Sequence, residues 1–333
     1  MNRLCFFLFV LIFPGMLHAE APGQGKDAFI EHMVEVHGFD KNQLESLFGR
    51  IERVAAVIRL ASPAPAAKPK DWKAYRARFV ERSRIAGGVH YWNEHEGALS
   101  KAGAKYDVPP EIIVAIIGVE TLYGRHTGNF RVLDALATLA FDYPETPNRE
   151  ARMAYFRSEL ENALVFARQS GIDPLSLYGS YAGAIGLPQF MPGSIMKYGV
   201  DFDGDGKIDL THSPADAIGS IANFLFMHGW KKGEPLVFPV SVSPENDGWK
   251  SMVGDISAKY SVQALEAAGI SPKGDMPKLN FGLIDLENGG NSTEYWLGTD
   301  NFFVIAQYNR SYYYAMSIVD LGRAVRRARF HIQ

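Results

Sequence analysis

Cysteine is nearly absent from this 333-residue chain, because its single copy is Cys5. Cys5 lies in the apolar stretch Leu4 to Phe13, which follows Arg3 and ends at Pro14-Gly15. A positive start, a short apolar stretch and small residues such as Ala19 are typical of a secretory signal peptide, and we expect it over residues 1–19. The stretch is too short to span a bilayer comfortably, although an uncleaved anchor is the alternative. Cleavage near Ala19 would leave a mature protein without thiol, disulfide or cysteine nucleophile.

An excess of charge of either sign is also missing. The chain has 34 Lys and Arg against 37 Asp and Glu, which gives a net charge of -3. This balance argues against nucleic acid as the main partner. Hydrophobic residues make up 47% of the chain and charged residues 21%, which is enough apolar surface for a globular core. The length suggests two or three compact units.

The spacing of apolar residues predicts a helical chain up to about Gly229 and strands after it. A proline-rich linker is expected over residues 61–69. The following stretch, 71–104, is expected to form either one helix or two helices that are interrupted at Gly87-Gly88. The expected helices cover residues 26–37, 40–60, 71–104, 111 to about 124, 133–141, 151–168, a short segment from 192, 214–228 and 312–329. The expected strands cover residues 236–240, 279–284 and 302–306.

Glu120 is the one acid between Ile112 and Tyr123, and it follows eight residues without a charge. Removing an ionised carboxylate from water is costly unless it is paired or its pKa rises. A carboxyl group that stays protonated near neutral pH is a candidate general acid. The alternative is a structural glutamate at the polar end of a core helix, paired with Arg125.

A second pattern, Asp201-Phe202-Asp203-Gly204-Asp205-Gly206-Lys207-Ile208-Asp209, matches a calcium-binding EF-hand loop at positions 1, 3, 5, 6 and 9. Lys207 occupies position 7, which contributes only its backbone carbonyl. Position 12 is His212 instead of a bidentate acid, so we expect Asp216 to supply a carboxylate from a longer loop. All of these ligands are oxygen atoms, which favours Ca²⁺ in a structural role. The alternative is a polar turn without an ion.

A third pattern is the glycine-rich segment Gly179 to Pro192. Small residues allow a ligand to approach the backbone closely. Gln189 offers a hydrogen-bond donor and an acceptor beside Phe190, an arrangement that suits an acetamido sugar.

Together these motifs resemble the lytic murein transglycosylase B family. The resemblance rests on Gly118-Val119-Glu120-Thr121-Leu122-Tyr123-Gly124, on the segment 183–192, on the calcium-like loop and on the tail from Tyr295 to Met316. It implies an α+β, mainly α fold with a lysozyme-like catalytic core, a helical domain and a small β domain. The implied boundaries are 26–104 for the helical domain, completed by the C-terminal helix 311–330, 105–235 for the core with its EF-hand-like loop 201–216, and 236–310 for the β domain.

The same resemblance implies the residues of the site. Glu120 matches the catalytic glutamate, and Gln189 and Phe190 match a substrate ledge in the segment that also contains Ser180. The remaining expected substrate-binding residues are Arg152, Tyr75 and Tyr308; for Tyr75 and Tyr308 plain packing between domains is the alternative. The expected metal ligands are Asp201, Asp203, Asp205, Lys207, Asp209 and Asp216, with structural Ca²⁺ and no organic cofactor.

The implied activity is cleavage of the β-1,4 bond between N-acetylmuramic acid and N-acetylglucosamine with formation of a 1,6-anhydro end, in cell-wall turnover. We find no convincing second carboxylate and interpret Asp134 and Asp142 as helix and turn acids. A single carboxylate is enough when the substrate supplies its own nucleophile, and the hypothesis is that Glu120 acts first as acid and then as base. A hydrolase that uses water and a catalytically silent glycan-binding scaffold are the alternatives. We expect a monomeric periplasmic protein, soluble and without a lipid anchor, whose partners are glycan strands and potentially cell-wall synthesis proteins.

Overall fold

The computed structural model describes residues 25–63 and 69–331. The expected signal peptide and the centre of the expected linker therefore lie outside the described residues. The chain divides into two compact units, and each is formed by segments that are distant in the sequence. Within the described residues, unit 1 contains 25–63 and 124–220, and unit 2 contains 69–123 and 221–331. The division into a helical domain, a catalytic core and a β domain that we expect from the sequence stays a prediction.

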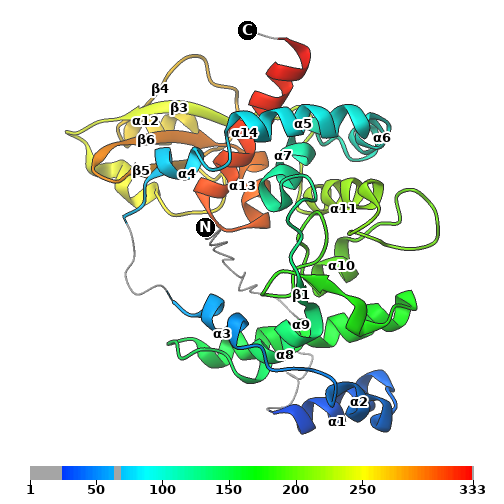
Figure 1. Cartoon of the computed structure of the whole chain (residues 1–333). Helices are drawn as coiled ribbons and strands as arrows, with labels where there is room; N and C mark the ends of the chain where they lie inside the picture. The colour runs from blue at the N-terminus through cyan, green and yellow to red at the C-terminus, as the bar shows by residue number, and fades with distance from the viewer. Residues whose placement is uncertain (1–24, 64–68, 332–333) are drawn as a thin grey trace. The chain divides into compact units, whose positions relative to one another are not determined.

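Unit 1 is helical and is built on two packed helices, α8 (Val132–Phe141) and α9 (Arg149–Ser170) (Figure 1). Nine of the ten residues of α8 are buried, which explains why its sequence is mostly apolar, and its two polar side chains, Asp134 and Thr138, are buried as well. The strand before α8 pairs with a strand that follows α9, and in this two-stranded antiparallel ribbon Phe130 lies opposite Gly179. The other elements are α1 (Lys26–His37), α2 (Lys41–Phe48), α3 (Ala55–Ala61), β1 (Phe130–Arg131), η1 (Pro174–Ser176), β2 (Tyr178–Gly179), α10 (Pro192–Tyr198) and the first half of α11 (Pro214–Met227).

Unit 2 is organised around α7 (Pro110–Thr121), whose residues Ile112 to Thr121 are all buried. The C-terminal helix α14 (Tyr312–Phe330) packs against α7 and α5, so the two ends of the unit's sequence share one core. The remaining helices are α4 (Trp72–Arg76), α5 (Arg82–Glu94), α6 (Glu96–Tyr106), α13 (Asp300–Tyr308) and the second half of α11.

A small antiparallel sheet completes unit 2, with strand order β4-β3-β6-β5. In its register Val240 lies opposite Tyr295 and Leu283 lies opposite Leu297. Val240, Leu283 and Leu297 form one core with Phe281, Leu265 and Ile270. The elements are β3 (Val237–Val242), η2 (Asp247–Met252), α12 (Val262–Ala267), β4 (Ile270–Pro272), β5 (Gly282–Asn288) and β6 (Asn291–Gly298). The expected strand at 279–284 thus begins later and runs longer, and β4 and β6 were missed.

The segment 302–306 was expected to be a strand, and this prediction is wrong because it is the middle of α13. Residues 301–306 are all buried, and a short apolar run without an exposed face does not distinguish a strand from a buried helix. Tertiary hydrogen bonds fix the helix start. The Asn301 side chain accepts from the backbone N–H of Lys231 at 2.7 Å and donates to the carbonyls of Lys231 and Glu234.

The expected helix 40–60 is also wrong in part, because it divides into α2 and α3. Between them, the N–H groups of Glu52 and Val54 donate to the side chains of Asp134 and Thr138 on α8, both at 3.0 Å. These bonds satisfy the backbone N–H groups of the extended segment, which therefore do not need carbonyl partners within a helix.

The expected break at Gly87-Gly88 is wrong as well, because both glycines lie inside α5. A Cβ at Gly88 would come within 2.6 Å of the Val325 side chain on α14. The glycines therefore serve close helix packing. The stretch 71–104 instead divides at 77–81 and at His95, which gives α4, α5 and α6.

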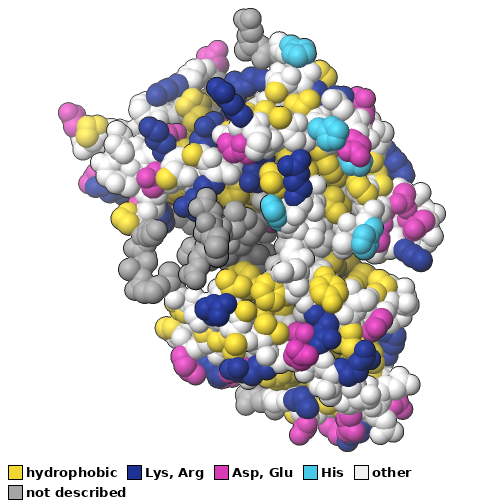
Figure 2. All heavy atoms as spheres, in the orientation of Figure 1, with side chains coloured by type: hydrophobic (Ala, Val, Ile, Leu, Met, Phe, Trp, Pro, Cys, Tyr) yellow, Lys and Arg dark blue, Asp and Glu magenta, His cyan; other side chains and the backbone are white. Residues whose placement is uncertain are grey.

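The visible surface carries charges of both signs. On the face shown in Figure 2, basic and acidic side chains are interspersed, in line with the balanced composition. Of the helices in residues 25–63 and 69–331, none has both the length and the apolar character that a membrane crossing requires.

Candidate active site

Glu120 lies in the last turn of α7 and is only 7% exposed. Its Oε1 accepts a hydrogen bond of 2.6 Å from the hydroxyl of Tyr314 on α14, a residue that is itself buried. Burial raises the pKa of Glu120 from 4.5 to about 7, and the Tyr314 hydrogen bond opposes this shift. Among the described residues, no basic side chain contributes to the shift, so a structural ion pair is not the explanation for this acid. The carboxyl group can therefore be protonated at neutral pH.

Aromatic side chains surround this carboxyl group. Tyr308 stacks on Tyr314 with ring centroids 6.2 Å apart. Burial and then the charge of Glu120 raise the pKa of Tyr308, and the same two causes raise the pKa of Tyr75 to about 12. The structure thus brings two expected substrate-binding residues, Tyr75 and Tyr308, into the electrostatic environment of Glu120. Tyr75 also packs on Trp72 and Tyr313, with centroids 6.4 and 5.6 Å away.

The end of α7 is conformationally unusual. Leu122, Tyr123 and Gly124 all have positive φ, at 52°, 60° and 85°, directly after Glu120 and Thr121. Left-handed conformations at non-glycine residues cost free energy and are concentrated at functional sites. Tyr123 is held in place by a hydrogen bond from its hydroxyl to the carbonyl of Arg84 at 2.9 Å.

Gly118 makes this turn sterically feasible. A Cβ at Gly118 would lie 2.6 Å from the Tyr123 hydroxyl, so no larger residue fits there without a shift. Its carbonyl accepts a 2.5 Å hydrogen bond from the guanidinium of Arg84 on α5. The motif around Glu120 is therefore fixed by packing within unit 2.

The glycine-rich segment of unit 1 forms a compact double turn. Ile185 and Phe190 exchange backbone hydrogen bonds of 2.8 and 3.2 Å, and the Ser180 hydroxyl accepts from Ala184 N–H at 3.0 Å. Gln189 has φ 52°. Its amide nitrogen donates to the carbonyls of Thr127 at 3.0 Å and Gly186 at 2.9 Å, so both amide hydrogens are used within unit 1. Phe190 is 3% exposed, so its ring packs inside unit 1.

Arg152 lies on α9, half-buried, and its positive charge lowers the pKa of Tyr155, which burial raises far more strongly. Tyr155 in turn interacts with Glu159 one turn further on. Burial raises the pKa of Glu159 to about 7, against hydrogen bonds from the N–H of Gly193 and from Tyr155. The Gly193 bond is 2.8 Å and attaches the start of α10 to α9.

Only some of the acidic side chains expected to bind metal in the loop 201–216 lie close together. Carboxylate oxygens of Asp201, Asp203 and Asp205 lie within 4.8 Å of one another, and this all-oxygen set fits a hard cation. Asp209 and Asp216 do not join this group. Asp209 accepts from the N–H groups of Thr211 and His212 at 2.9 and 2.8 Å.

Asp216 is buried and has a different function in this loop. Its oxygens accept from the N–H groups of Phe202 and Asp209 at 2.7 and 2.9 Å, so it stabilises the loop from within. The loop also supports the glycine-rich segment, because the N–H of Leu187 donates to the carbonyl of Leu210 at 2.8 Å.

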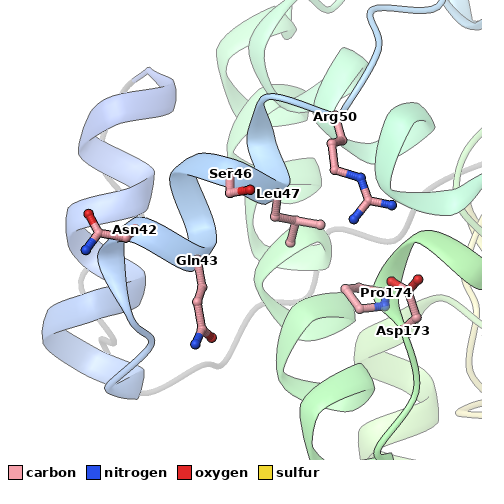
Figure 3. A pocket seen from close by; sticks show the side chains of 7 residues that line it. All are labelled: Asn42, Gln43, Ser46, Leu47, Arg50, Asp173 and Pro174. Carbon is pink, nitrogen blue, oxygen red and sulfur yellow. The ribbon is translucent and has the colours of Figure 1, made fainter.

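Two open surface hollows, of about 410 and 420 Å³, contain neither Glu120 nor Gln189 in their walls. Figure 3 shows the first, where Arg50 points toward the turn at Asp173 and Pro174. The second lies along β3 and β6. Carboxyl chemistry, and not the size of a hollow, therefore identifies the candidate site.

Sequence reasoning missed two residues of this arrangement. Tyr314 lies in the run Tyr312-Tyr313-Tyr314, but only the packing of α14 on α7 shows which of the three hydroxyls reaches Glu120. Glu159 lies in a helix rich in charge, where the sequence gives no signal that this acid is buried.

Comparisons with known proteins give a consistent result. Residues 23–323 match the family model of the transglycosylase SLT domain. The chain is 43% identical over 312 residues to the membrane-bound lytic murein transglycosylase B of Escherichia coli (strain K12), covering 90% of this chain and 82% of that protein. The structure of the E. coli lytic transglycosylase Slt35 in complex with calcium is 42% identical, with a TM-score of 0.81 over 91% of this chain and 93% of that chain. SltB3 from Pseudomonas aeruginosa in complex with NAG-anhNAM-pentapeptide is 28% identical, with a TM-score of 0.76 over 89% and 77%.

Proposed function

Because the chain belongs to the transglycosylase SLT domain family and is a peptidoglycan lytic transglycosylase with a mainly helical, lysozyme-like fold, we propose that Glu120 carries the reaction. The observation that supports this assignment is the buried carboxyl group whose pKa is about 7. Such a group is protonated in a large fraction of molecules near neutral pH and can still ionise. A residue that acts first as an acid and then as a base needs both properties.

The first step is proton transfer from Glu120 to the glycosidic oxygen as the bond between that oxygen and C1 of N-acetylmuramic acid breaks. The N-acetyl group of the same sugar stabilises the oxocarbenium-like centre at C1. Glu120 is then ionised, and the Tyr314 hydroxyl donates to the carboxylate. This charge-assisted hydrogen bond is stronger than the bond to the neutral acid.

In the second step ionised Glu120 takes the proton of the C6 hydroxyl of that sugar, and O6 forms a bond to C1. The product is a 1,6-anhydro ring, Glu120 is protonated again, and no water is consumed. The P. aeruginosa relative SltB3, crystallised with NAG-anhNAM-pentapeptide, supports this product.

The two other acids that were considered for a catalytic role, Asp134 and Asp142, are engaged in ion pairs, which is consistent with a mechanism that uses one carboxylate. Asp134 is ion-paired with Arg131 at 2.7 Å, and Asp142 is ion-paired with Arg53 at 2.5 Å. In the described part of the chain, no second acid contributes to the pKa of Glu120. A classical glycosidase needs two carboxylates that flank the bond.

The decisive experiment is digestion of purified sacculi followed by mass spectrometry of the products. The wild-type protein should release muropeptides with anhydro ends, which lack the mass of one water. Glu120→Gln should release none, whereas the matched control Glu111→Gln, on the same helix, should remain active. Hydrated ends would identify a water-using hydrolase, and no release by the wild-type protein would identify a silent binding scaffold.

We assign substrate binding to Gln189, Ser180, Arg152, Tyr75 and Tyr308, with Phe190 shaping the turn that presents Gln189. The amide oxygen of Gln189 suits the N–H of an acetamido group, because the amide nitrogen already donates within the turn. Gln189→Ala should raise KM more than it lowers kcat. An unchanged KM for glycan strands would contradict this role.

We also assign a structural Ca²⁺ to Asp201, Asp203 and Asp205, with the backbone carbonyl of Lys207 as a further ligand. The Slt35 complex with calcium supports this assignment. The two other expected ligands, Asp209 and Asp216, would act through the loop's own hydrogen bonds. Because Leu210 holds Leu187, the ion would stabilise the glycine-rich segment and thereby Gln189. No organic cofactor is required by the chemistry.

We propose that the protein acts in the periplasm, where its peptidoglycan substrate lies, after export through the signal peptide expected over residues 1–19. We also propose that it is a monomer without a lipid anchor. Cell fractionation with the Cys5→Ala variant tests the absence of an anchor. If Cys5→Ala moved the protein from the membrane to the soluble fraction, the assignment would be wrong.

A further inference from the structure

A cluster of three metal-ligating side chains lies in unit 1, separate from the acidic loop. His32 and His37 belong to α1, and Glu161 belongs to α9, which packs against α1 (Figure 1). The Nε2 atom of His37 is 2.6 Å from Oε1 of Glu161, and the Nε2 atom of His32 is 3.5 Å from the same oxygen. One ligand atom of each residue lies within 4.8 Å of the others. We propose that these three side chains form a zinc-binding site that joins α1 to α9.

The donor set selects the metal. Two imidazole nitrogens and one carboxylate oxygen suit Zn²⁺, whereas Ca²⁺ prefers oxygen ligands only. With Zn–N and Zn–O bonds of roughly 2.0–2.2 Å in a tetrahedron, the ligand atoms are about 3.3 Å apart. His32 and Glu161 already have nearly this separation, and His37 and Glu161 must move apart by less than an ångström. The fourth position is left for water.

The fold preorganises the three ligands. Phe29 and Met33 bury the apolar side of α1, and the Phe29 ring lies 6.0 Å from that of Phe141. At the helix end, Arg168 of α9 donates to the carbonyl of His37 at 2.8 Å. A cation also suits this end, because the C-terminus of a helix carries partial negative charge.

Access and ring orientation are compatible with an ion. The side chains of His32, His37 and Glu161 are 15%, 24% and 20% exposed, so the cluster is partly shielded but reachable from solvent. The two imidazole rings are 6.2 Å apart and nearly perpendicular, at 80°. Zinc would replace the hydrogen bond between His37 and Glu161.

The test is a zinc titration of the full chain, purified without a histidine tag and saturated with Ca²⁺ so that the acidic loop is occupied. Isothermal titration calorimetry with ZnCl₂ should give one equivalent, and Co²⁺ should give visible absorption of a tetrahedral site. His37→Gln and Glu161→Gln should each lower zinc affinity at least tenfold. The matched control is His90→Gln, because the exposed His90 pairs with a single acid among the described residues, Glu94 at 3.5 Å.

Retention of helical circular dichroism shows that a variant is folded. Should His37→Gln lose it, His32→Gln becomes the deciding variant, since its imidazole is farther from the carboxylate. The melting temperature of the wild-type protein should rise with zinc, and that of the variants should not. Absence of zinc uptake at micromolar concentration, or equal affinity in wild type and both histidine variants, would overturn the site. Neither result depends on glycan cleavage.

Discussion

The burial of Glu120 predicts a specific coupling between pH and stability. Its pKa is about 7 in the folded protein and 4.5 when the group is free in water, so folding favours the protonated form. The free energy of unfolding that this preference contributes is fully present below pH 4.5, where Glu120 is protonated in both the folded and the unfolded protein. It is lost as the pH rises from 4.5 through 7, because the folded protein must then bury a charge.

The magnitude follows from the shift. At 1.36 kcal/mol per pKa unit, a change from 4.5 to about 7 corresponds to about 3 kcal/mol. Gln is uncharged, is nearly isosteric and keeps an oxygen that can accept from Tyr314. The stability of Glu120→Gln relative to wild type should therefore increase by about 3 kcal/mol between pH 4.5 and pH 8. For a protein of this size that is on the order of 5 °C in melting temperature.

The assay is thermal unfolding of both proteins at pH 4.5 and pH 8, with sacculus digestion in parallel. Glu159→Gln should show a similar pH-dependent gain, because burial raises the pKa of Glu159 to about 7 as well. Glu111→Gln gives the baseline for removing an acid from α7. A difference between Glu120→Gln and wild type that stays constant with pH would refute the reasoning, because Glu120 would then ionise in a hydrated environment.

Three further outcomes are expected. Tyr314→Phe removes the hydrogen bond that lowers the pKa of Glu120. It should therefore shift the alkaline limb of the pH–activity profile upward by about one pH unit. The control is Tyr313→Phe, which should leave that limb in place because the Tyr313 hydroxyl donates to the carbonyl of Glu287. Asp203→Asn should reduce the rise in melting temperature that Ca²⁺ produces, and an equal rise in both proteins would remove Asp203 from the ligand set. Gly128→Ala should cost several kcal/mol, roughly as a severe steric clash does, since its Cβ would lie 2.0 Å from the carbonyl oxygen of Gly179. Gly171→Ala, at φ +65° in open space, should cost only about 1–2 kcal/mol in denaturant unfolding.

The sequence was sufficient to predict those helix starts that depend on residues within one or two turns. The helix that carries Glu120 was expected to begin after Pro109-Pro110, and α7 begins at Pro110. The starts of α1, α10, α11 and α14 agree with the expected helix starts for the same reason, since caps and periodicity act within a few residues. Glu120 itself was visible as a lone acid in an apolar run.

The prediction of secondary structure failed where contacts with residues distant in the sequence determine the conformation. The strand expected at 302–306 is α13, because Asn301 is held by Lys231 and Glu234 and because the segment is buried on all sides. The break expected at Gly87-Gly88 is absent, since α14 uses those glycines for close approach. Neither contact is encoded near the segment that it controls.

The sequence by itself determined the family motifs, most of the helices and the identity of the acid at position 120, because these depend on neighbours along the chain. Only the tertiary structure decided that the acid is buried beneath the Tyr314 hydroxyl and has a pKa near 7. It also decided that His32 and His37, five residues apart on one helix, meet the same carboxylate of α9. A pKa and a ligand set depend on the groups within a few ångströms of an atom, and most of those groups come from elsewhere in the chain.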